Sequence, residues 1–189
     1  MILRRLVDKT VLRMWLVLAV ISTVLSLIVY GAVQQTLRTS ANDPQIQLAE
    51  DIGKSLSAGK EVDNILPTNS VDISHSLGTF VILYDDNGQV VTGNGQLGSE
   101  APSLPSGVLA YTKENQEDVV TWQPEKDVRI AAVVYRHEGP VPGFVLAGRN
   151  LREVEKRIRF IGYEIIAGWA VALISTMGVL LVTTPKSKK

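Results

Sequence analysis

The chain has 189 residues, and its 19 lysines and arginines balance its 19 aspartates and glutamates, so its formal net charge at pH 7 is zero. This balance gives no basic surface of the kind that nucleic acids require, so we expect no nucleic-acid partner. Cysteine is absent, which excludes disulfides, thiolate metal sites and a cysteine nucleophile. The apolar residues gather near the two ends, and the middle has the composition of a soluble domain.

The first apolar segment, residues 14–33, reads MWLVLAVISTVLSLIVYGAV and contains no charged residue. About 20 such residues in a helix are enough to cross a hydrocarbon core of about 30 Å. A cleaved signal peptide is the alternative, but its apolar run is usually shorter, and the YGA sequence near the end of this run is a poor cleavage site. We therefore expect an uncleaved transmembrane helix over residues 14–35, preceded by a basic cytoplasmic segment, residues 1–13.

A soluble domain is expected over residues 36–158. Its first helix should begin at the sequence NDP, residues 42–44, where a capping side chain precedes a proline at the first helical position. Gly59 can close this helix, and the polar residues 60–70 read as a loop.

Two β-rich segments follow the loop. Residues 78–84 (GTFVILY) lead into the sequence DDNG at residues 85–88 and then into residues 89–92 (QVVT). β-Branched and aromatic runs on either side of an Asn-Gly turn predict a β-hairpin. The DDNG sequence lacks the alternating ligands and the distal glutamate of a calcium loop, so we expect a turn here and no metal site.

The second half of the domain should add a short helix and three strands. Residues 93–107 carry several glycines and prolines and read as a loop. The elements expected after it are a helix over Gly107–Asn115 and strands over Asp118–Gln123, Val128–His137 and Gly143–Gly148. This order predicts an α+β fold, with a five-stranded antiparallel sheet and helices packed on one side.

A charged helix should begin near residue 150 and continue without a proline to residue 183. In it, Glu153 and Glu155 precede Arg157 and Arg159 by four residues, which is the favourable order for helix ion pairs. We expect this exit helix to enter the membrane directly.

The second apolar segment, residues 159–184, has no charge from Ile165 onward. Core helices of soluble proteins are usually shorter and have a polar face, so we expect a second transmembrane helix here. Residues 185–189 would then form a short tail.

The orientation follows from the basic residues that flank the two spans. They precede the first span and follow the second, so the positive-inside rule places both termini in the cytoplasm. Basic residues between 149 and 159 oppose this arrangement, but charge counts matter less for segments longer than about 60 residues. We expect a two-pass protein of the inner (cytoplasmic) membrane with its domain outside the cytoplasm.

Apolar and small residues repeat along the exit helix in steps of three and four. The series is Leu151, Val154, Ile158, Ile161, Ile165, Gly168, Ala172, Ser175, Val179 and Val182. This heptad pattern predicts a packing surface whose members become small inside the membrane, where small residues let helices approach closely. The first span offers a similar set, namely Ala19, Ser22, Thr23 and Ser26. The partner of this surface is the first span, a second copy in a homodimer, or both together, and membrane lipid surrounds the rest.

The middle domain carries one candidate ligand site. Trp122, Arg129 and Tyr135 lie on neighbouring expected strands, and an arginine beside aromatic rings can bind a small carboxylate or another anion. The alternative is an exposed sheet face with a cross-strand pair. His75 and His137 lie in no metal-ligand spacing and are expected to be solvated or hydrogen-bonded. We expect no metal, no cofactor and no enzymatic activity.

One combination of elements leads into the second membrane span. It consists of the hairpin FVILYDDNGQVV, the strands RIAAVVYR and GFVLAGRN, and the exit helix LREVEKRI. This combination resembles the extracytoplasmic PAS-like sensor modules, or Cache domains, of bacterial receptors and sensor histidine kinases. The resemblance runs from about Pro44 to Ile158. It implies a PAS-like sheet and a sensory role, because modules of this family bind small metabolites or ions or mediate dimer contacts.

Two hypotheses for the function follow. In the first, a sensor-like membrane protein binds a small ligand or a partner outside the cytoplasm and relays this event through the second transmembrane helix. No output domain follows that helix, so the chain would signal through a partner such as a histidine kinase, or it would be the front part of a longer receptor. In the second, a structural or accessory membrane subunit presents an interaction domain. A ligand-sized pocket with polar groups would favour the first, and an exposed apolar patch the second.

Overall fold

The computed structural model of the chain describes residues 9–184, except for the side chain of Asp63. Residues 1–8 of the expected N-terminal segment and all of the expected tail, residues 185–189, lie outside the described residues.

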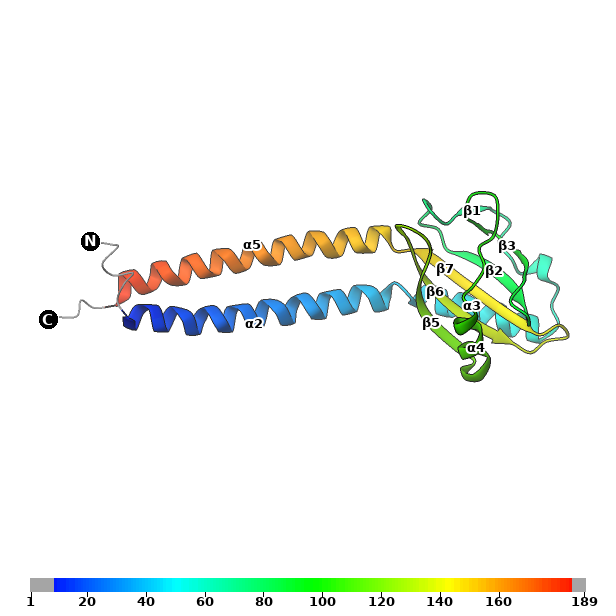
Figure 1. Ribbon diagram of the computed structural model, residues 1–189, viewed down its shortest axis with the longest axis horizontal. Coiled ribbons are helices and arrows are strands. Elements are labelled where there is room, and N and C mark those ends of the chain that lie inside the picture. Colours follow the sequence, from blue (N-terminus) through cyan, green and yellow to red (C-terminus); the bar gives the residue numbers. More distant parts are fainter. Residues whose placement is uncertain (1–8, 185–189) are drawn as a thin grey trace. The chain divides into compact units, whose positions relative to one another are not determined.

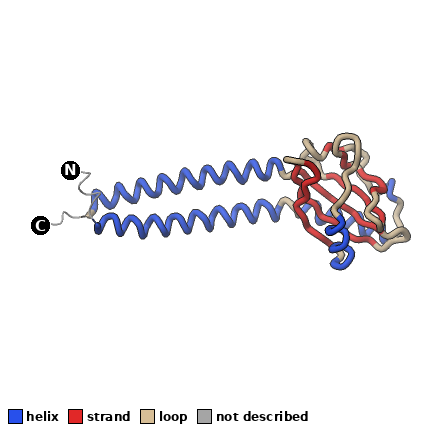
Figure 2. The backbone as a smooth tube through the Cα atoms, in the orientation of Figure 1, coloured by secondary structure: helices blue, strands red, loops and turns tan. Residues whose placement is uncertain are grey.

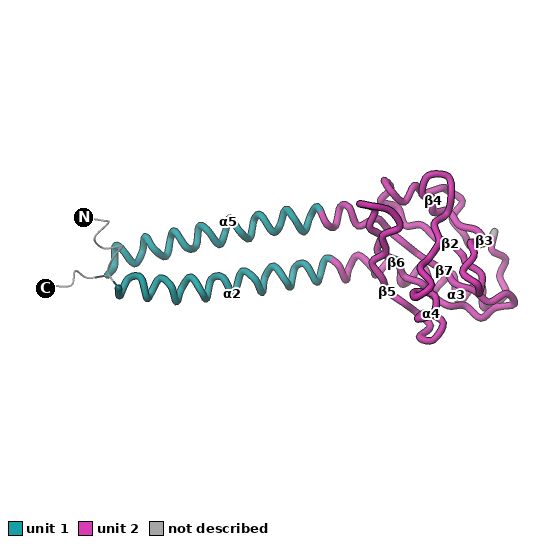
Figure 3. The backbone as a smooth tube through the Cα atoms, viewed as in Figure 1, with its two compact units in different colours: residues 1–37, 156–189 teal, residues 38–155 magenta. Residues whose placement is uncertain are grey.

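The chain divides into two compact units, which are described separately (Figure 3): the helical unit, Met1–Leu37 with Lys156–Lys189, and the sheet unit, Arg38–Glu155. The helical unit contains most of α2 (Lys9–Ser40) and of α5 (Arg152–Thr183), each 32 residues long. Both helices are long and apolar enough to cross a membrane, and their most apolar stretches contain no buried residue. A helix of this length measures about 48 Å, more than a hydrocarbon core requires.

The sheet unit is built on a five-stranded antiparallel sheet (Figure 1). Its strands are β2 (Phe80–Asp85), β3 (Val90–Gly93), β5 (Glu117–Glu125), β6 (Val128–His137) and β7 (Gly143–Asn150). In space the order is β3-β2-β7-β6-β5, so the first and last of these strands in sequence are neighbours at the centre. The predicted α+β class and five-stranded antiparallel sheet are confirmed. The strands that the structure describes, red in Figure 2, all belong to this unit.

Each face of the sheet carries its own apolar core. On one face, α3 (Asp43–Ser57) packs against residues that include Val81, Leu83, Val133 and Val145. On the other face, α4 (Ser106–Asn115) adds Val108 and Leu109 to a core whose buried residues include Phe80, Ile82, Ile130 and Val134. The expectation of helices on one side is therefore wrong. The central strands are buried on both faces, and both faces need a cover.

The ends of α3 follow the predicted signals in part. The helix begins with Pro44 in its first turn, but Asn42 caps it through its backbone carbonyl and makes no side-chain hydrogen bond. At the other end Gly59 has a φ of +79°, and the Lys60 amide donates to the Ser55 carbonyl at 3.1 Å. This closing turn needs a left-handed residue, which explains the glycine.

The predicted hairpin turn between β2 and β3 is confirmed. Gly88 has a φ of +81°, and its amide donates to the Asp85 carbonyl at 3.0 Å. The Asp85 carboxylate also accepts hydrogen bonds from the amides of Asn87 and Gln89, at 2.9 and 2.8 Å. The aspartate is therefore used by the turn itself.

A small parallel pair of strands, β1 (Val71–Asp72) and β4 (Gly95–Gln96), was not predicted. Each strand has two residues, which is too short for a periodic pattern. The buried Asn94 ties this pair to the main sheet, because its Oδ1 accepts a hydrogen bond from the Val81 amide at 2.7 Å. A 3-10 turn, η1 (Val62–Asn64), lies in the segment read as a loop.

Candidate functional site

The three residues predicted to bind an anion do not converge. Trp122 pairs with Ile130 between β5 and β6 and is buried in the core on the α4 side of the sheet. Arg129 and Tyr135 share the opposite face of β6, but they lie six positions apart, or about 20 Å along a strand. Tyr135 packs against the core on the α3 side. Strand alternation thus separates the tryptophan from the other two side chains.

Arg129 already has an anionic partner. Its guanidinium donates to Glu155 Oε1 of α5 at 2.5 Å, and the two side chains are half-buried. The Arg129 carbonyl also accepts a hydrogen bond from the Leu151 amide at 2.8 Å. The predicted helix pair of Glu155 with Arg159 is not among the ion pairs of residues 9–184, because Glu155 contacts β6 instead. Arg129 therefore links the start of β6 to the start of α5 and offers no vacant anion site.

The first two residues predicted to pack along α5 belong to the sheet unit. Leu151 is buried with Ala41 and Ala131, and Val154 packs against this small cluster. These residues attach the start of α5 to the sheet and do not form a helix-to-helix seam. Ile158, the next residue in the predicted series, is also buried.

Within the helical unit, the side of α5 that contacts α2 agrees only in part with the predicted one, because Ile165 belongs to both. The contacting residues are Gly162, Ile165, Trp169 and Leu173. Ala172 is half-buried, whereas Gly168 and Ser175 are exposed, and nothing lies within 4 Å of a Cβ added to Gly168. The prediction used a strict seven-residue repeat, and a straight helix drifts by about 20° per heptad from that repeat. Packing of Gly168 and Ser175 against a second copy stays a prediction.

On the first helix, the predicted set of small residues does lie toward α5. Ala19, Ser22, Thr23 and Ser26 are half-buried, in contrast to the exposed apolar residues around them. The Thr23 hydroxyl accepts a hydrogen bond from Trp169 Nε1 at 3.0 Å. The alternative in which the two long helices of one chain pack together therefore describes this structure.

A cleft of about 340 Å³ opens in the sheet unit beside the C-terminal end of α3. Its lining residues are Leu56, Gly59, Lys60, Glu61, Val62, Leu83, Tyr84, Asp85, Val91, His137, Pro140, Val141 and Pro142. They come from the end of α3 and the segment after it, from the β2–β3 hairpin, and from the end of β6 with the turn that follows. The lining surface is mostly apolar, and the volume falls in the range of small-molecule sites.

The turn between β6 and β7 is held closely against α3. A Cβ added to Gly139 would lie 2.5 Å from the Leu56 carbonyl oxygen, so this approach requires glycine. Next to it, the Glu138 amide donates to Ser57 Oγ at 3.3 Å. These contacts fix one wall of the cleft against the end of the helix.

His137 is one of the polar residues that line this cleft. Its side chain is buried, with the residue 7% exposed, and its Nδ1 has no hydrogen-bond partner within the described part of the chain. Burial lowers the pKa of the imidazole below its usual 6.5, and the neighbouring charge of Arg136 lowers it further. The ring is therefore neutral near pH 7, and Nδ1 can donate or accept a hydrogen bond according to its tautomer. A buried polar atom without a partner costs about 1–3 kcal/mol.

Charged side chains lie at the rim of the cleft. Lys60 and Glu61 are exposed there, and Asp85 is half-buried. The Asp85 carboxylate is committed to the hairpin turn, as described above. Among residues 9–184 Lys60 has no ion-pair partner, so its ammonium group can meet a polar end of a bound molecule.

Sequence reasoning missed His137 as a site residue. It treated this histidine as solvated or hydrogen-bonded, and the structure buries it without a partner for Nδ1. The available signal was its position at the end of a strand, on the same face as Tyr135 and Val133, directly before a turn rich in glycine and proline. That sequence signal alone does not indicate that the C-terminal end of α3 lies beside His137.

Comparisons of the chain with protein-family models, with curated proteins and with solved structures find no match. Within the described part of the chain, no three side chains of His, Asp or Glu gather in a way that could hold a metal ion. The function must therefore be argued from the cleft, the charges and the connections of the chain itself.

Proposed function

We propose that the chain is a membrane-anchored, sensor-like protein whose sheet unit binds a small ligand in the His137 cleft. The sheet unit lies outside the cytoplasm, and α2 and α5 both span the inner membrane with their outer ends joined to it. Ligand binding is relayed through α5 to a partner protein, such as a histidine kinase. The ligand is small and mostly apolar, with one group that hydrogen-bonds to His137.

The observation that carries this proposal is that His137 lines a mostly apolar cleft of ligand size, and that its buried Nδ1 has no hydrogen-bond partner within residues 9–184. Buried polar side-chain atoms in folded proteins nearly always have a partner, so an exception in a cleft needs an explanation. A bound molecule with one polar group supplies that partner, and its apolar body covers side chains such as Leu56 and Leu83.

The connections of the cleft support a relay. His137 pairs with Gly143 at the start of β7, and only Leu151 separates the end of β7 from α5. On the other side, α3 lines the cleft with Leu56 and follows α2 after only two residues. The elements around the cleft are thus the ones that continue into the two long helices. The resemblance to Cache-type sensor modules is consistent with this arrangement.

A binding test on the full chain in detergent micelles addresses the proposal. Thermal unfolding is followed while indole, phenol, benzoate, cyclohexanol or hexanoate is added as a probe. A probe that binds at 100 times its dissociation constant stabilises the folded state by about 2.7 kcal/mol. We expect at least one probe with a hydrogen-bonding group to raise the unfolding temperature.

Two histidine variants locate the effect of such a probe. His137→Phe keeps an aromatic ring and removes both ring nitrogens, so it should lose the shift for probes that depend on the polar contact. His75→Phe is the matched control, because that histidine is exposed and lies outside the cleft. An equal shift in wild type and His137→Phe would contradict the proposed contact, and no shift with any probe would contradict the ligand class.

An accessory membrane subunit is the second candidate function. The observation in its favour is that Val91 and Val141, which border the cleft, are 59% and 72% exposed. In this alternative the same region docks an apolar side chain of a protein partner. Val141→Asp would then abolish recovery of the partner with the tagged chain from solubilised membranes, while small-molecule probes would leave the unfolding temperature unchanged.

A further inference from the structure

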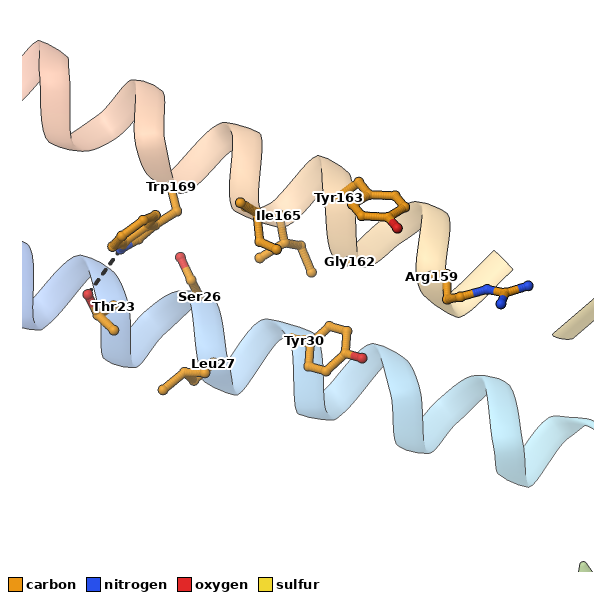
Figure 4. A pocket seen from close by; sticks show the side chains of 10 residues that line it. Thr23, Ser26, Leu27, Tyr30, Arg159, Gly162, Tyr163, Ile165 and Trp169 are labelled. Carbon is orange, nitrogen blue, oxygen red and sulfur yellow. Dashed lines mark hydrogen bonds between the residues drawn. The ribbon is translucent and has the colours of Figure 1, made fainter. Parts of the chain in front are cut away.

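A second cleft, of about 470 Å³, lies in the helical unit between α2 and α5 (Figure 4). Its lining residues are Thr23, Ser26, Leu27 and Tyr30 of α2 with Arg159, Gly162, Tyr163, Ile165, Ile166 and Trp169 of α5. The lining is almost entirely apolar. Figure 4 shows Trp169 toward one end of this cleft and Arg159 toward the other.

Two tryptophans hold the helices together, one at the Trp169 end of this cleft and one farther along the helices. Trp169 Nε1 donates to Thr23 Oγ1 at 3.0 Å, and Trp15 Nε1 donates to the Leu173 carbonyl at 3.0 Å. These contacts are antiparallel, because earlier residues of α2 meet later residues of α5. A large ring at each contact keeps the two helix backbones apart. The backbones therefore do not come close enough to fill the cleft between Trp169 and Tyr30.

The cleft is amphipathic along its length. The end at Arg159 carries a guanidinium and the hydroxyls of Tyr30 and Tyr163, and the other end is formed by apolar side chains and the Trp169–Thr23 contact. Tyrosines and arginines are typical of the level of the lipid headgroups. Arg159 has no ion-pair partner within residues 9–184, because the nearby Glu155 is paired with Arg129.

We propose that this cleft binds one anionic phospholipid from the leaflet at the Arg159 end of the helices. Its phosphate pairs with Arg159, and one acyl chain lies along Leu27, Ile165 and Ile166 toward Trp169. A guanidinium binds phosphate by two parallel hydrogen bonds. It favours phosphatidylglycerol over phosphatidylcholine, because the choline ammonium offsets the charge of the phosphate and repels the guanidinium. The inference rests on the membrane-spanning part of the proposed function and is independent of the His137 cleft.

Native mass spectrometry of the full chain tests this site. The chain is reconstituted in nanodiscs with equal amounts of phosphatidylglycerol and phosphatidylcholine, and the lipids that remain bound after release are identified. We expect one retained lipid per chain, with phosphatidylglycerol enriched about tenfold, which corresponds to about 1.4 kcal/mol. Arg159→Gln should bring the two lipids back to the ratio supplied.

Two further variants sharpen the test. Arg157→Gln removes a charge from an exposed arginine that does not line the cleft, so the enrichment should persist. Gly162→Leu places a side chain in the cleft, where a Cβ would already lie 3.4 Å from the Tyr30 ring, so both lipids should be retained several-fold less. The two arginine variants keep the test decisive even where Gly162→Leu does not fold.

The outcomes separate the inference from the proposed function. The lipid site is contradicted if the wild-type chain retains both lipids in the supplied ratio. It is also contradicted if Arg157→Gln and Arg159→Gln lose the phosphatidylglycerol enrichment equally, which would indicate general attraction by basic residues. Observation of a dimer of the chain without bound lipid would contradict the lipid site and would indicate that a second copy of the chain occupies the cleft. Extraction of the wild-type chain from membranes by alkaline carbonate would instead contradict the membrane-spanning part of the proposed function.

Discussion

His137 combines burial with a titratable ring, so the stability of the sheet unit should depend on pH just below neutrality. Its pKa is lowered in the folded state by burial and by Arg136, whereas the unfolded chain keeps the usual 6.5. The unfolded state then binds more protons as the pH falls through 6.5, and the free energy of unfolding falls with it until the folded-state pKa is passed. We expect the unfolding temperature to drop between about pH 7.5 and about pH 5.5.

The comparison that isolates this effect uses His137→Phe, which should unfold with a flatter pH dependence over the same range. Asp72 and Asp86 do not interfere, because their pKa values are lowered from 3.8, mainly by hydrogen bonds to their neighbours, and they titrate at lower pH. His75→Phe serves as the control for loss of an exposed histidine. If His137→Phe retains the full wild-type slope, His137 is not the group responsible.

Several single residues could be interpreted correctly from the sequence, because their roles are local. Gly88 and Gly59 have the left-handed backbone that their turns require, and Pro44 lies in the first turn of α3. The roles of Arg129 and His137 could not be predicted. Their environments depend on α5 and α3, which are distant in sequence, and no local pattern states which helix will cover which strand end.

The contact between β6 and α5 is the element-scale feature on which the proposed relay would depend. A double-mutant cycle with Arg129→Gln and Glu155→Gln should give a coupling energy of about 0.2–1 kcal/mol, as for other half-exposed pairs. The matched control is the cycle of Glu153→Gln and Arg157→Gln, a pair predicted from helix spacing. That pair is not among the ion pairs of residues 9–184, and its coupling should be near zero. The reverse ranking of the two cycles would contradict the contact.

The exposed side of α5 gives a prediction about self-association. If Gly168 and Ser175 pack against a second copy, Gly168→Ile should reduce cysteine crosslinking between chains by about tenfold, because a branched side chain keeps the backbones apart. Ala170→Ile is the control, since each residue turns the helix by about 100° and Ala170 lies on the other side from Gly168. Equal crosslinking in Gly168→Ile and wild type would leave the predicted surface without a role.

Elements with a strong local pattern were predicted well, and their spatial arrangement was not. The hairpin, β6 and α4 lie within a few residues of their expected bounds. The placement of α3 and α4 on opposite faces follows from the burial of both faces of the central strands, which a propensity argument does not weigh. The two-residue strands β1 and β4 are defined only by their hydrogen-bonded pairing with each other, which no local sequence pattern indicates.

For the whole molecule, the proposed topology predicts that the sheet unit and the C-terminal tail lie on opposite sides of the membrane. Cysteines introduced at Ser103, in the sheet unit, and at Ser187 should label oppositely with an impermeant reagent added to intact cells. Since the chain has no native cysteine, each signal is unambiguous. Labelling at Ser187→Cys but not at Ser103→Cys would show the opposite orientation. Labelling at both positions would contradict a membrane crossing between residues 103 and 187.

The central claim, that a ligand partners the buried nitrogen of His137, can be observed directly by nitrogen NMR. The chain has two histidines, so uniform ¹⁵N-histidine labelling of wild type and of His75→Phe assigns both rings. In the free chain the His137 ring should stay neutral through pH 6.5, and a probe that raises the unfolding temperature should shift its Nδ1 resonance while His75 remains unchanged. A His137 ring that protonates at or above pH 6.5, or an Nδ1 resonance that no stabilising probe moves, would contradict the account.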